Sequence, residues 1–307
     1  MTEAVLLRRR GLGFKSALGL KQWFEEQGNR LTIIRNDDHR VTGTMENPTH
    51  VIRWGCTGNL GEAGIRGDLP VLNHVSAIKK VNSKRLFLME LPNQYTPGLI
   101  VNREQINRSL INQTNQYVIR PKTHSRGRHL RVTGSIGEFL NFISQPAFSG
   151  GWYARPLVNK SAEYRVFIVD GKAVQVSKKI PGNSNRVAWN VAQGATFENV
   201  RWDNWPLNVC QLAEDIFPYT GLNFTGIDIM VDQANNPHFI EANSAPTLPF
   251  NEDGTPTYRQ QCMAKGLMYS VEHNRPDLSN AGENYEGWRK FIHPAIWENH
   301  RLHGGVQ

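Results

Sequence analysis

The sequence predicts an α/β protein that combines a parallel sheet near its start with antiparallel, α+β architecture further along. Over roughly the first 80 residues, short apolar strands alternate with helices, which is typical of a small domain built on a parallel sheet. Beyond residue 160, two pairs of β-rich runs are each joined by a turn cluster, which indicates antiparallel hairpins. We therefore expect two kinds of sheet in one chain.

The N-terminal elements follow from the spacing of apolar residues. A helix over 16–27 would turn four large apolar side chains inward. Gly11 and Gly13 precede it as in a phosphate-binding loop, but the third glycine of the dinucleotide-binding spacing is missing, so nucleotide binding there is the less favoured interpretation. Buried strands are expected over 5–7, 31–35, 50–54 and 69–73.

The middle of the chain carries a basic loop after a predicted strand. Residues 120–129 follow a strand over 116–120 and contain arginines, a lysine, two histidines, a hydroxyl pair and Gly127. Backbone N–H groups of such a loop, with Arg120 at the strand end, can cradle a polyphosphate, and a solvated basic turn is the alternative. The other elements expected here are helices over 82–91, 103–112 and 135–144 and strands over 99–101 and 152–156.

Two hairpins and a helix make up the C-terminal half. Asp170-Gly171 is a two-residue turn inside a β-rich stretch over 163–176. A Gly- and Asn-rich loop over 181–194 follows, and an amphipathic helix is expected over 206–217. The second hairpin spans 223–246, with its turn within 232–237.

This second hairpin brings two carboxylates together. If its turn centres near Ala234 and Asn235, Asp228 lies opposite Glu241, and Asn243 shares a side of the sheet with Glu241. Like charges facing each other in an apolar sheet are costly unless a cation lies between them. Two carboxylates and an amide suit Mg²⁺. The alternative is that Asp228 merely ends a strand and Glu241 points to solvent.

Composition narrows the class of protein. The chain has 307 residues, and this length is enough for two domains or one large domain with a sizeable core. Of its residues, 39% are hydrophobic and 20% are charged. It shows neither a signal-peptide pattern nor an apolar run of the roughly 18 residues that a membrane span needs. Three scattered cysteines favour a reducing cytoplasm over a disulfide framework. A net charge of +8 indicates an acidic partner such as a nucleotide, a nucleic acid or an acidic peptide.

The order of these motifs resembles the ATP-grasp superfamily, specifically its ribosomal-protein glutamate ligase and glutathione synthetase-like branch. The resemblance covers roughly residues 84–246, and residues 5–81 are similar to that branch's N-terminal domain by pattern only. Its most specific part is Gly-[Ile/Val]-Asp followed by [Phe/Val]-x-Glu-x-Asn-x-x-Pro, present here at 226–228 and 239–246.

The resemblance implies an ATP-grasp fold, in which a small Rossmann-like N-terminal domain precedes two α+β subdomains that clasp ATP. The N-terminal domain would occupy 1–81, the central subdomain with the phosphate lid loop 82–154, and the C-terminal subdomain with the metal hairpin and a helical tail 155–307.

The resemblance also implies a set of site residues, carried over position by position. A lysine opening a helix, a basic strand end with its lid, a hinge that contacts adenine through its backbone and an acidic ribose ligand would bind ATP. The matching positions are Lys84, Arg120, Lys122, His124, Ser125, Gly127, Tyr153, Ala154, Arg155 and Glu163. One or two Mg²⁺ ions, or Mn²⁺ in their place, would be held by Asp228, Glu241 and Asn243. The substrate carboxylate and oxyanion would be held by Arg165, Asn190, Arg186 and Lys178.

Several positions depart from the family pattern. Arg120 replaces the usual lysine and presents a planar fork to the phosphates. The lid lacks a second glycine, and Ala154 stands where relatives often carry glutamate, which leaves backbone recognition of adenine intact. A family Arg-Ser-Asn is matched only at Asn190, so Arg186 is the candidate for the missing arginine.

The activity implied by the resemblance is ATP-dependent ligation. ATP would phosphorylate a carboxylate, and an amine would attack the acyl phosphate, releasing ADP and phosphate. The partners would be a small amine or amino acid and a carboxylate or acidic peptide or protein. The alternative is a catalytically weak nucleotide-binding protein whose basic surface binds nucleic acid. Neither interpretation involves a membrane, and both leave the oligomeric state open.

The tail, residues 257–307, lies beyond the resemblance. Its three histidines, His293, His300 and His303, could suggest a metal site. We favour packing of the tail on the body through an apolar stripe formed by Trp288, Phe291, Ile292, Ile296 and Trp297.

Overall fold

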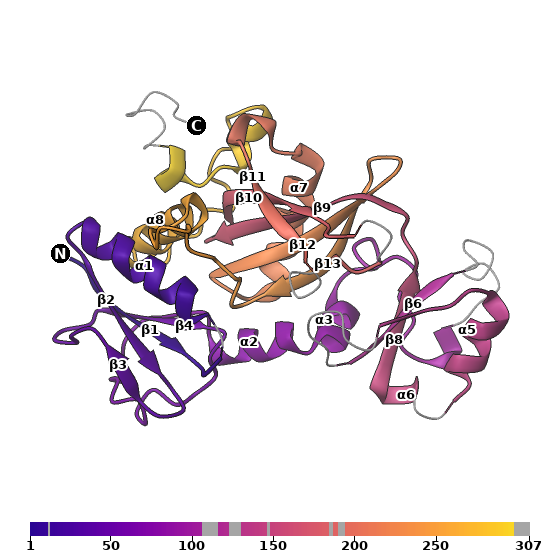
Figure 1. The fold of residues 1–307 in the computed structure, drawn as a ribbon, viewed down its shortest axis with the longest axis horizontal. Coiled ribbons are helices and arrows are strands. Elements are labelled where there is room, and N and C mark those ends of the chain that lie inside the picture. Colours follow the sequence, from indigo (N-terminus) through magenta and orange to yellow (C-terminus); the bar gives the residue numbers. More distant parts are fainter. Residues whose placement is uncertain are drawn as a thin grey trace.

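Three β-sheets organise the protein. A computed structural model of the chain describes residues 1–11, 13–105, 116–122, 130–145, 148–183, 187–189 and 194–297. The strand orders are β3-β2-β1-β4-β5, β7-β6-β8 and β11-β10-β9-β12-β13. In Figure 1 the first sheet lies at the left, the small second sheet at the right, and the third between and above them. Among the described residues, no helix combines the length and apolar character of a membrane span.

The N-terminal sheet is parallel apart from one edge strand. Its strands are β1 (Glu3–Arg8), β2 (Arg30–Arg35), β3 (Arg40–Thr42), β4 (His50–Trp54) and β5 (Val71–Leu72). Alternate residues of β1 enter two different cores: Leu6 packs with α1 (Phe14–Glu26), and Leu7 packs with the chain around Ile65 on the other face. Coverage of both faces explains why these strands are apolar throughout. The predicted parallel sheet is confirmed, whereas the short antiparallel β3, largely exposed, was not expected.

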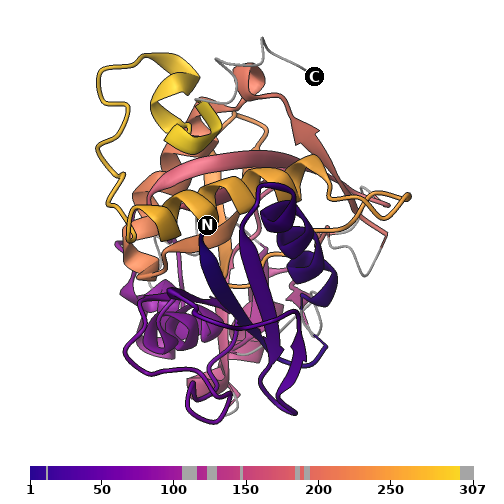
Figure 2. The same cartoon turned by 90° about the vertical axis from the view of Figure 1, so that its left-hand side faces the viewer.

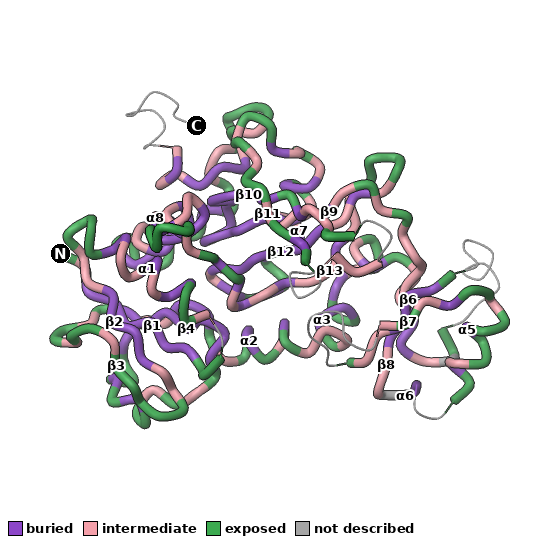
Figure 3. The backbone as a smooth tube through the Cα atoms, in the orientation of Figure 1, coloured by how far each residue is buried: buried purple, intermediate pink, exposed green. Residues whose placement is uncertain are grey.

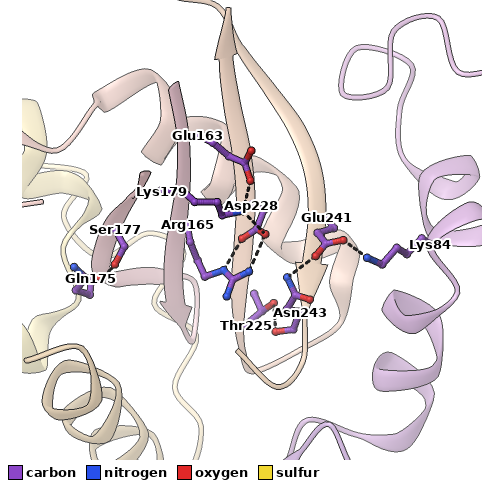
Figure 4. A network of polar contacts seen from close by, with 10 residues as sticks. All are labelled: Lys84, Glu163, Arg165, Gln175, Ser177, Lys179, Thr225, Asp228, Glu241 and Asn243. Carbon is purple, nitrogen blue, oxygen red and sulfur yellow. Dashed lines mark hydrogen bonds and ion pairs between the residues drawn. The ribbon is translucent and has the colours of Figure 1, made fainter. Parts of the chain in front are cut away.

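Two short helices connect this domain to the rest. The sequence predicts one helix over 82–91, but the structure has α2 (Val75–Asn82) and α3 (Lys84–Glu90). They meet at Ser83, whose ψ of 76° ends the first helix and begins the second. This break places Lys84 at the first residue of α3, facing the third sheet (Figure 4).

The small sheet has a core of its own. It consists of β6 (Tyr117–Pro121), β7 (Arg131–Val132) and β8 (Trp152–Pro156), with helices α5 (Ile136–Ile143) and α6 (Phe148–Gly151). Ser135 caps α5 by accepting a hydrogen bond from the N–H of Glu138, 3.2 Å away. Tyr117 stacks on Phe139 with ring centroids 3.9 Å apart. The helix expected over 103–112 is described only at its start, where η1 (Arg103–Gln105) lies.

The third sheet is antiparallel and contains both predicted hairpins. Its strands are β9 (Lys160–Val169), β10 (Lys172–Ile180), β11 (Thr196–Val200), β12 (Phe224–Asp232) and β13 (Pro237–Asn243). Asp170 and Gly171 both adopt positive φ, 48° and 97°, as a two-residue hairpin turn requires. The helix α7 (Leu207–Thr220) packs on β9, β12 and β13, and α8 (Tyr258–Glu272) packs on β9 and β10. Figure 3 shows β10 and β12 buried over most of their length.

The N-terminal domain is fixed against the end of the second hairpin. Asn73 accepts hydrogen bonds from the N–H groups of Asn223 and Phe224, at 2.8 and 3.1 Å, and donates to Phe224. Ser16 exchanges hydrogen bonds with the backbone of Leu248, at 2.9 and 3.3 Å. Helices α1 and α8 lie side by side, as Figure 2 shows. The strand ends of the first sheet therefore stand close to residues 244–248, just beyond β13.

The tail packs on the body as predicted. Phe291, Ile292 and Ile296 belong to the main core, with Trp288 and Trp297 packed against it. The turn η3 (Trp202–Asn204) meets η4 (Gly287–Phe291) through the rings of Trp202 and Trp288, 4.1 Å apart.

His293 has a structural place in this core. It is fully buried, its Nδ1 accepts a hydrogen bond from the N–H of Ala295, and burial lowers its pKa to about 3. Because His300 and His303 lie outside the described residues, the histidine metal site gains no support.

Two buried acids, Glu214 and Asp170, make the stability of the fold depend on pH. Burial, only partly offset by the Lys172 ammonium 3.0 Å away, raises the pKa of Glu214 from 4.5 to about 7, and burial raises that of Asp170 to about 7 as well. The folded state holds these protons more tightly than the unfolded state. The contribution of Glu214 to stability is therefore fully present below pH about 4.5 and that of Asp170 below pH about 3.8, and both are lost as the pH rises through about 7.

We expect the free energy of unfolding to fall between pH 5 and 8, by at most about 3 kcal/mol per group. Urea unfolding at several pH values should show a smaller fall in Glu214→Gln and in Asp170→Asn. A pH profile in both variants that parallels the wild-type profile would contradict this assignment.

Candidate functional site

One face of the third sheet gathers charged side chains from four neighbouring strands. The register pairs Arg165 of β9 with Asp228 of β12, and Asp228 with Glu241 of β13. Side chains of directly paired residues point to the same face, and so do those two positions apart along a strand. Figure 4 shows this face, to which Lys84 is added from α3.

The predicted pairing of Asp228 with Glu241 is confirmed, but by an unexpected route. Near the turn, Val231 pairs with Pro237, which taken alone would place Glu241 one position away from Asp228. An irregularity between Asp228 and Ile229 shifts the register by one residue and brings the two carboxylates opposite each other. Asn243 lies beside them and donates a hydrogen bond to Glu241, 3.2 Å away.

Asp228 is neutralised by a guanidinium fork. Its two oxygens accept hydrogen bonds from Nε and Nη2 of Arg165, at 2.5 and 2.8 Å, and the Lys179 ammonium is 3.6 Å away. The residue is only 3% exposed. A bidentate pair of this kind is strong and directional, so it holds Arg165 flat against β12.

The close fit of this pair depends on Gly226. A Cβ at that position would lie 2.9 Å from Cβ of Pro246 and 3.2 Å from Cδ of Arg165. A larger residue would therefore displace the arginine or the segment that follows β13.

Glu241 is neutralised from outside the sheet. The Lys84 ammonium donates a hydrogen bond to it from the first turn of α3. Burial alone would raise the pKa of Glu241, but Lys84 and then Arg165 outweigh burial and lower it to about 2. Glu241 is therefore ionised at neutral pH and bound to an ammonium group.

Glu163, predicted as the ribose ligand, is 4% exposed and lies between two lysines. Lys160 contacts one oxygen at 2.6 Å, and Lys179 donates to the other. Lys160 also lies over the ring of Trp189, 4.1 Å from its centroid. A nucleotide hydroxyl at this carboxylate would share it with these two lysines or replace one of them.

The donor set fits a magnesium ion. Two paired carboxylates and an amide are all-oxygen ligands, and the cations now beside them, Lys84 and Arg165, show that this point of the sheet requires positive charge. Among the described residues, no three His, Cys, Asp or Glu side chains gather as a metal-binding group. The remaining ligands would thus come from phosphate oxygens and water, as Mg²⁺ prefers.

Among the predicted substrate ligands, Arg165 belongs to the cluster and Lys178 does not. A simple count from the Asp170-Gly171 turn would place Lys178 opposite Glu163. A register shift between Ala173 and Gln175 moves β10 by one residue, so Lys179 faces inward and Lys178 is exposed. Arg186 and Asn190 lie outside the described residues.

The predicted adenine hinge is a strand whose backbone is already hydrogen-bonded. Ala154 donates its N–H to Ile100 at 2.8 Å and accepts the N–H of Ile100 at 2.9 Å. The N–H and carbonyl groups of Ala154 are therefore both already paired in this structure. Tyr153 is buried, and Arg155 donates to the carbonyl of Phe239, 2.6 Å away, which ties the small sheet to β13.

Arg120 and Lys122 stand at the end of β6, half-buried and exposed respectively, where the lid loop begins. His124, Ser125 and Gly127 lie in 123–129, outside the described residues.

The sequence reasoning missed Lys160 and Lys179. Alternation along β9 and β10 is the signal that could have found them, because Lys179 shares a face with Ser177, which pairs with Arg165. The register shift in β10 concealed this relation.

Comparisons with known proteins agree with this arrangement. The family pattern described as "Prokaryotic glutathione synthetase, ATP-grasp domain" matches residues 84–237, just over half of the chain. Asp228 lies within the match, and Glu241 and Asn243 lie shortly after it. Among curated proteins, none matches the chain by sequence.

Solved structures with a similar fold include three ligases. PsnB, an ATP-grasp ligase complexed with a minimal precursor, has a TM-score of 0.60 at 11% identity over 88% of this chain and 99% of its own. D-alanine–D-alanine ligase from Bacillus anthracis has a TM-score of 0.58 at 11% identity over 90% of this chain and 99% of its own. A Chryseobacterium gregarium RiPP-associated ATP-grasp ligase, in complex with ADP and a leader and core peptide, has a TM-score of 0.58. Its identity to this chain is 12% over 88% of this chain and 97% of its own. These similarities confirm the predicted ATP-grasp fold.

The Lys84–Glu241 pair predicts opposite effects on metal and nucleotide binding. In Lys84→Met, Mn²⁺ alone should bind about tenfold more tightly, because no ammonium competes for Glu241. ADP should bind about tenfold more weakly, because the Lys84 ammonium is no longer there to contact its phosphates. Isothermal titration calorimetry with each ligand measures both changes.

Lys80→Met is the matched control, since Lys80 pairs with Glu90 on the connecting helices, 2.8 Å apart, and should change neither affinity. Affinities for Mn²⁺ and ADP that are unchanged in Lys84→Met would refute the role given to Lys84.

Proposed function

Because the chain belongs to the family of the prokaryotic glutathione synthetase ATP-grasp domain, we propose that it is an ATP-dependent ligase that joins a carboxylate to an amine. The observation that carries this proposal is the buried charged face of the third sheet. There Asp228 and Glu241 face each other beside Arg165, and each carboxylate has a cation as its partner. A purely structural sheet would gain nothing from burying so many charges.

In this proposal the nucleotide phosphates replace Glu241 as the partner of Lys84. Arg120 and Lys122, at the end of β6, bind phosphate oxygens together, and His124, Ser125 and Gly127 of the lid loop close over the γ-phosphate. Since Ala154 is engaged with Ile100, the backbone contact to adenine falls to residues 156–159, which connect β8 to β9. Tyr153 and Arg155 support that connection from the strand before it.

Asp228, Glu241 and Asn243 would hold Mg²⁺. Such an ion would supply positive charge that offsets the negative charge of the phosphoryl group during transfer. Lys84 and Arg165, which neutralise these carboxylates in the structure, then become available to anionic groups of ATP and substrate.

The chemistry has two displacements. A substrate carboxylate oxygen attacks the γ-phosphorus, the bond to the β–γ bridging oxygen breaks, and ADP leaves. The amine then attacks the acyl carbon, the bond to the phosphate oxygen breaks, and phosphate leaves while the amine loses a proton to solvent or to His124. Arg165, with Asn190 and Arg186, stabilises the oxyanion that forms at the acyl carbon.

Peptides and amino acids are the substrates to test first. Ligases of similar fold include one with a leader and core peptide and one that acts on D-alanine. The net charge of +8 on this chain suits an acidic peptide or small acid as the carboxylate substrate. Three buried, unpaired cysteines fit work in a reducing compartment such as the cytoplasm.

The test is ADP release from Mg-ATP with pools of amino acids and acidic peptides. We expect release that needs both a carboxylate and an amine, and a rate at least about 100-fold lower in Asp228→Asn, because Mg²⁺ would lose a carboxylate ligand.

Asp232→Asn makes the same substitution at the far end of the same strand, where Asp232 contacts His238, and should retain the rate. If ADP binds but no pool supports its release, the protein is not a ligase for these classes and the nucleic-acid-binding alternative gains ground.

A further inference from the structure

Three cationic side chains surround the ring of Phe197. Cζ of Arg165, Nζ of Lys179 and Cζ of Arg259 lie 5.0, 5.4 and 5.4 Å from the ring centroid. Phe197 is opposite Lys179 in the register of β10 and β11, so its ring lies on the charged face. Arg259 comes from the first turn of α8, beyond the segment that matches the family. Each distance is within the range of a cation–π contact.

Charge balance singles out Arg259. Arg165 is paired with Asp228, and Lys179 with Glu163. Arg259 is 6% exposed and has no carboxylate partner among the described residues. A buried guanidinium without a counter-charge is costly, and here two further cations share the same ring.

Neutral groups position Arg259 without neutralising it. Its Nε and Nη2 donate to Oδ1 of Asn199, and Nη2 also donates to the carbonyl of Phe197, all at 3.3 Å. Asn199 in turn accepts from Gln175 at 3.2 Å, and Gln175 accepts from Ser177 at 2.9 Å. These contacts are longer than the roughly 2.7–2.9 Å of hydrogen bonds to carboxylates. Nη1 has no partner among the described residues.

Arg259 also lies away from the place of the phosphates. Phe197 is on the edge strand β11, and Glu241, with Lys84, is on the opposite edge strand β13. Four strand spacings of about 4.8 Å separate these edges, roughly 19 Å in all. Arg165 stands between them. An anion bound by Arg165 and Arg259 would thus approach from the side opposite the nucleotide.

We infer that Arg259 and Arg165, with Phe197 beneath them, bind a carboxylate of the acidic substrate. This inference rests on the proposed function, in which Mg²⁺ takes Asp228 and leaves Arg165 without its carboxylate partner. Two guanidinium groups on one ring then lack carboxylate partners, and one substrate carboxylate can accept hydrogen bonds from both. Arg165 and Phe197 lie within the segment 84–237 that matches the family, and Arg259 lies beyond it, so the proposed site depends on one residue from outside the matched segment.

The experiment measures carboxylate binding to the protein saturated with Mg-ADP. Calorimetric titrations use acetate, succinate, glutarate and the dipeptide γ-glutamylglycine, with wild type, Arg259→Met and Arg259→Lys. We expect at least one dicarboxylate or the dipeptide to bind wild type, about tenfold weaker binding to Arg259→Met, and a smaller loss in Arg259→Lys, which retains charge without the planar fork. The affinity for Mg-ADP should be the same in all three proteins.

Arg53→Met is the matched control. Arg53 is 5% exposed and donates only to the carbonyls of Cys56 and Gly58, in the N-terminal domain. Its loss should lower the melting temperature as the loss of Arg259 does, but leave carboxylate binding unchanged. If Arg259→Met does not fold, the comparison between wild type and Arg259→Lys decides.

Several outcomes would overturn the inference. One is that none of these carboxylates binds to the wild-type protein. Another is that they bind equally well to wild type and to the Arg259 variants. A third is that the Arg259 variants bind the ATP analogue AMP-PNP more weakly but bind ADP as wild type does, which would assign Arg259 to the γ-phosphate. If the wild-type protein does not bind Mg-ADP at all, the proposed function itself is refuted.

Discussion

Two carboxylates that face each other across neighbouring strands are the constraint on which the rest of the site depends. The register of β12 and β13 holds Asp228, which is 3% exposed, opposite Glu241, whose side chain is 21% exposed. Repulsion between them must be offset by positive charge at short range. The structure meets this demand with Arg165 from a third strand and Lys84 from a helix outside the sheet.

This demand explains why distant parts of the chain converge. The break between α2 and α3 brings Lys84 to Glu241, and the fork of Arg165 requires the close approach that Gly226 allows. The N-terminal domain is hydrogen-bonded to Leu248, just past the second hairpin, so its strand ends border the same face. A ligand that brings its own cation and anions can exchange partners with these pairs. Every charge at the site then keeps a partner of opposite sign.

Sequence patterns predict most of this arrangement, but not its register. The parallel N-terminal sheet, both hairpins, the ATP-grasp fold and the pairing of Asp228 with Glu241 follow from apolar spacing, turns and motif order. Two one-residue irregularities could not be foreseen, because a bulge depends on packing rather than on local sequence. One keeps Asp228 opposite Glu241, whereas the other exchanges Lys178 for Lys179. Engagement of the Ala154 backbone by Ile100 is likewise a tertiary contact without a local signal.

The central claim is that a carboxylate is activated by phosphoryl transfer on this face of the sheet. Its most direct test uses a carboxylate substrate labelled with ¹⁸O in both oxygens, together with its amine and Mg-ATP. If the acid becomes an acyl phosphate, each turnover moves one labelled oxygen into inorganic phosphate, which mass spectrometry detects. Product formation with unlabelled phosphate, or with the label in AMP, would contradict the account.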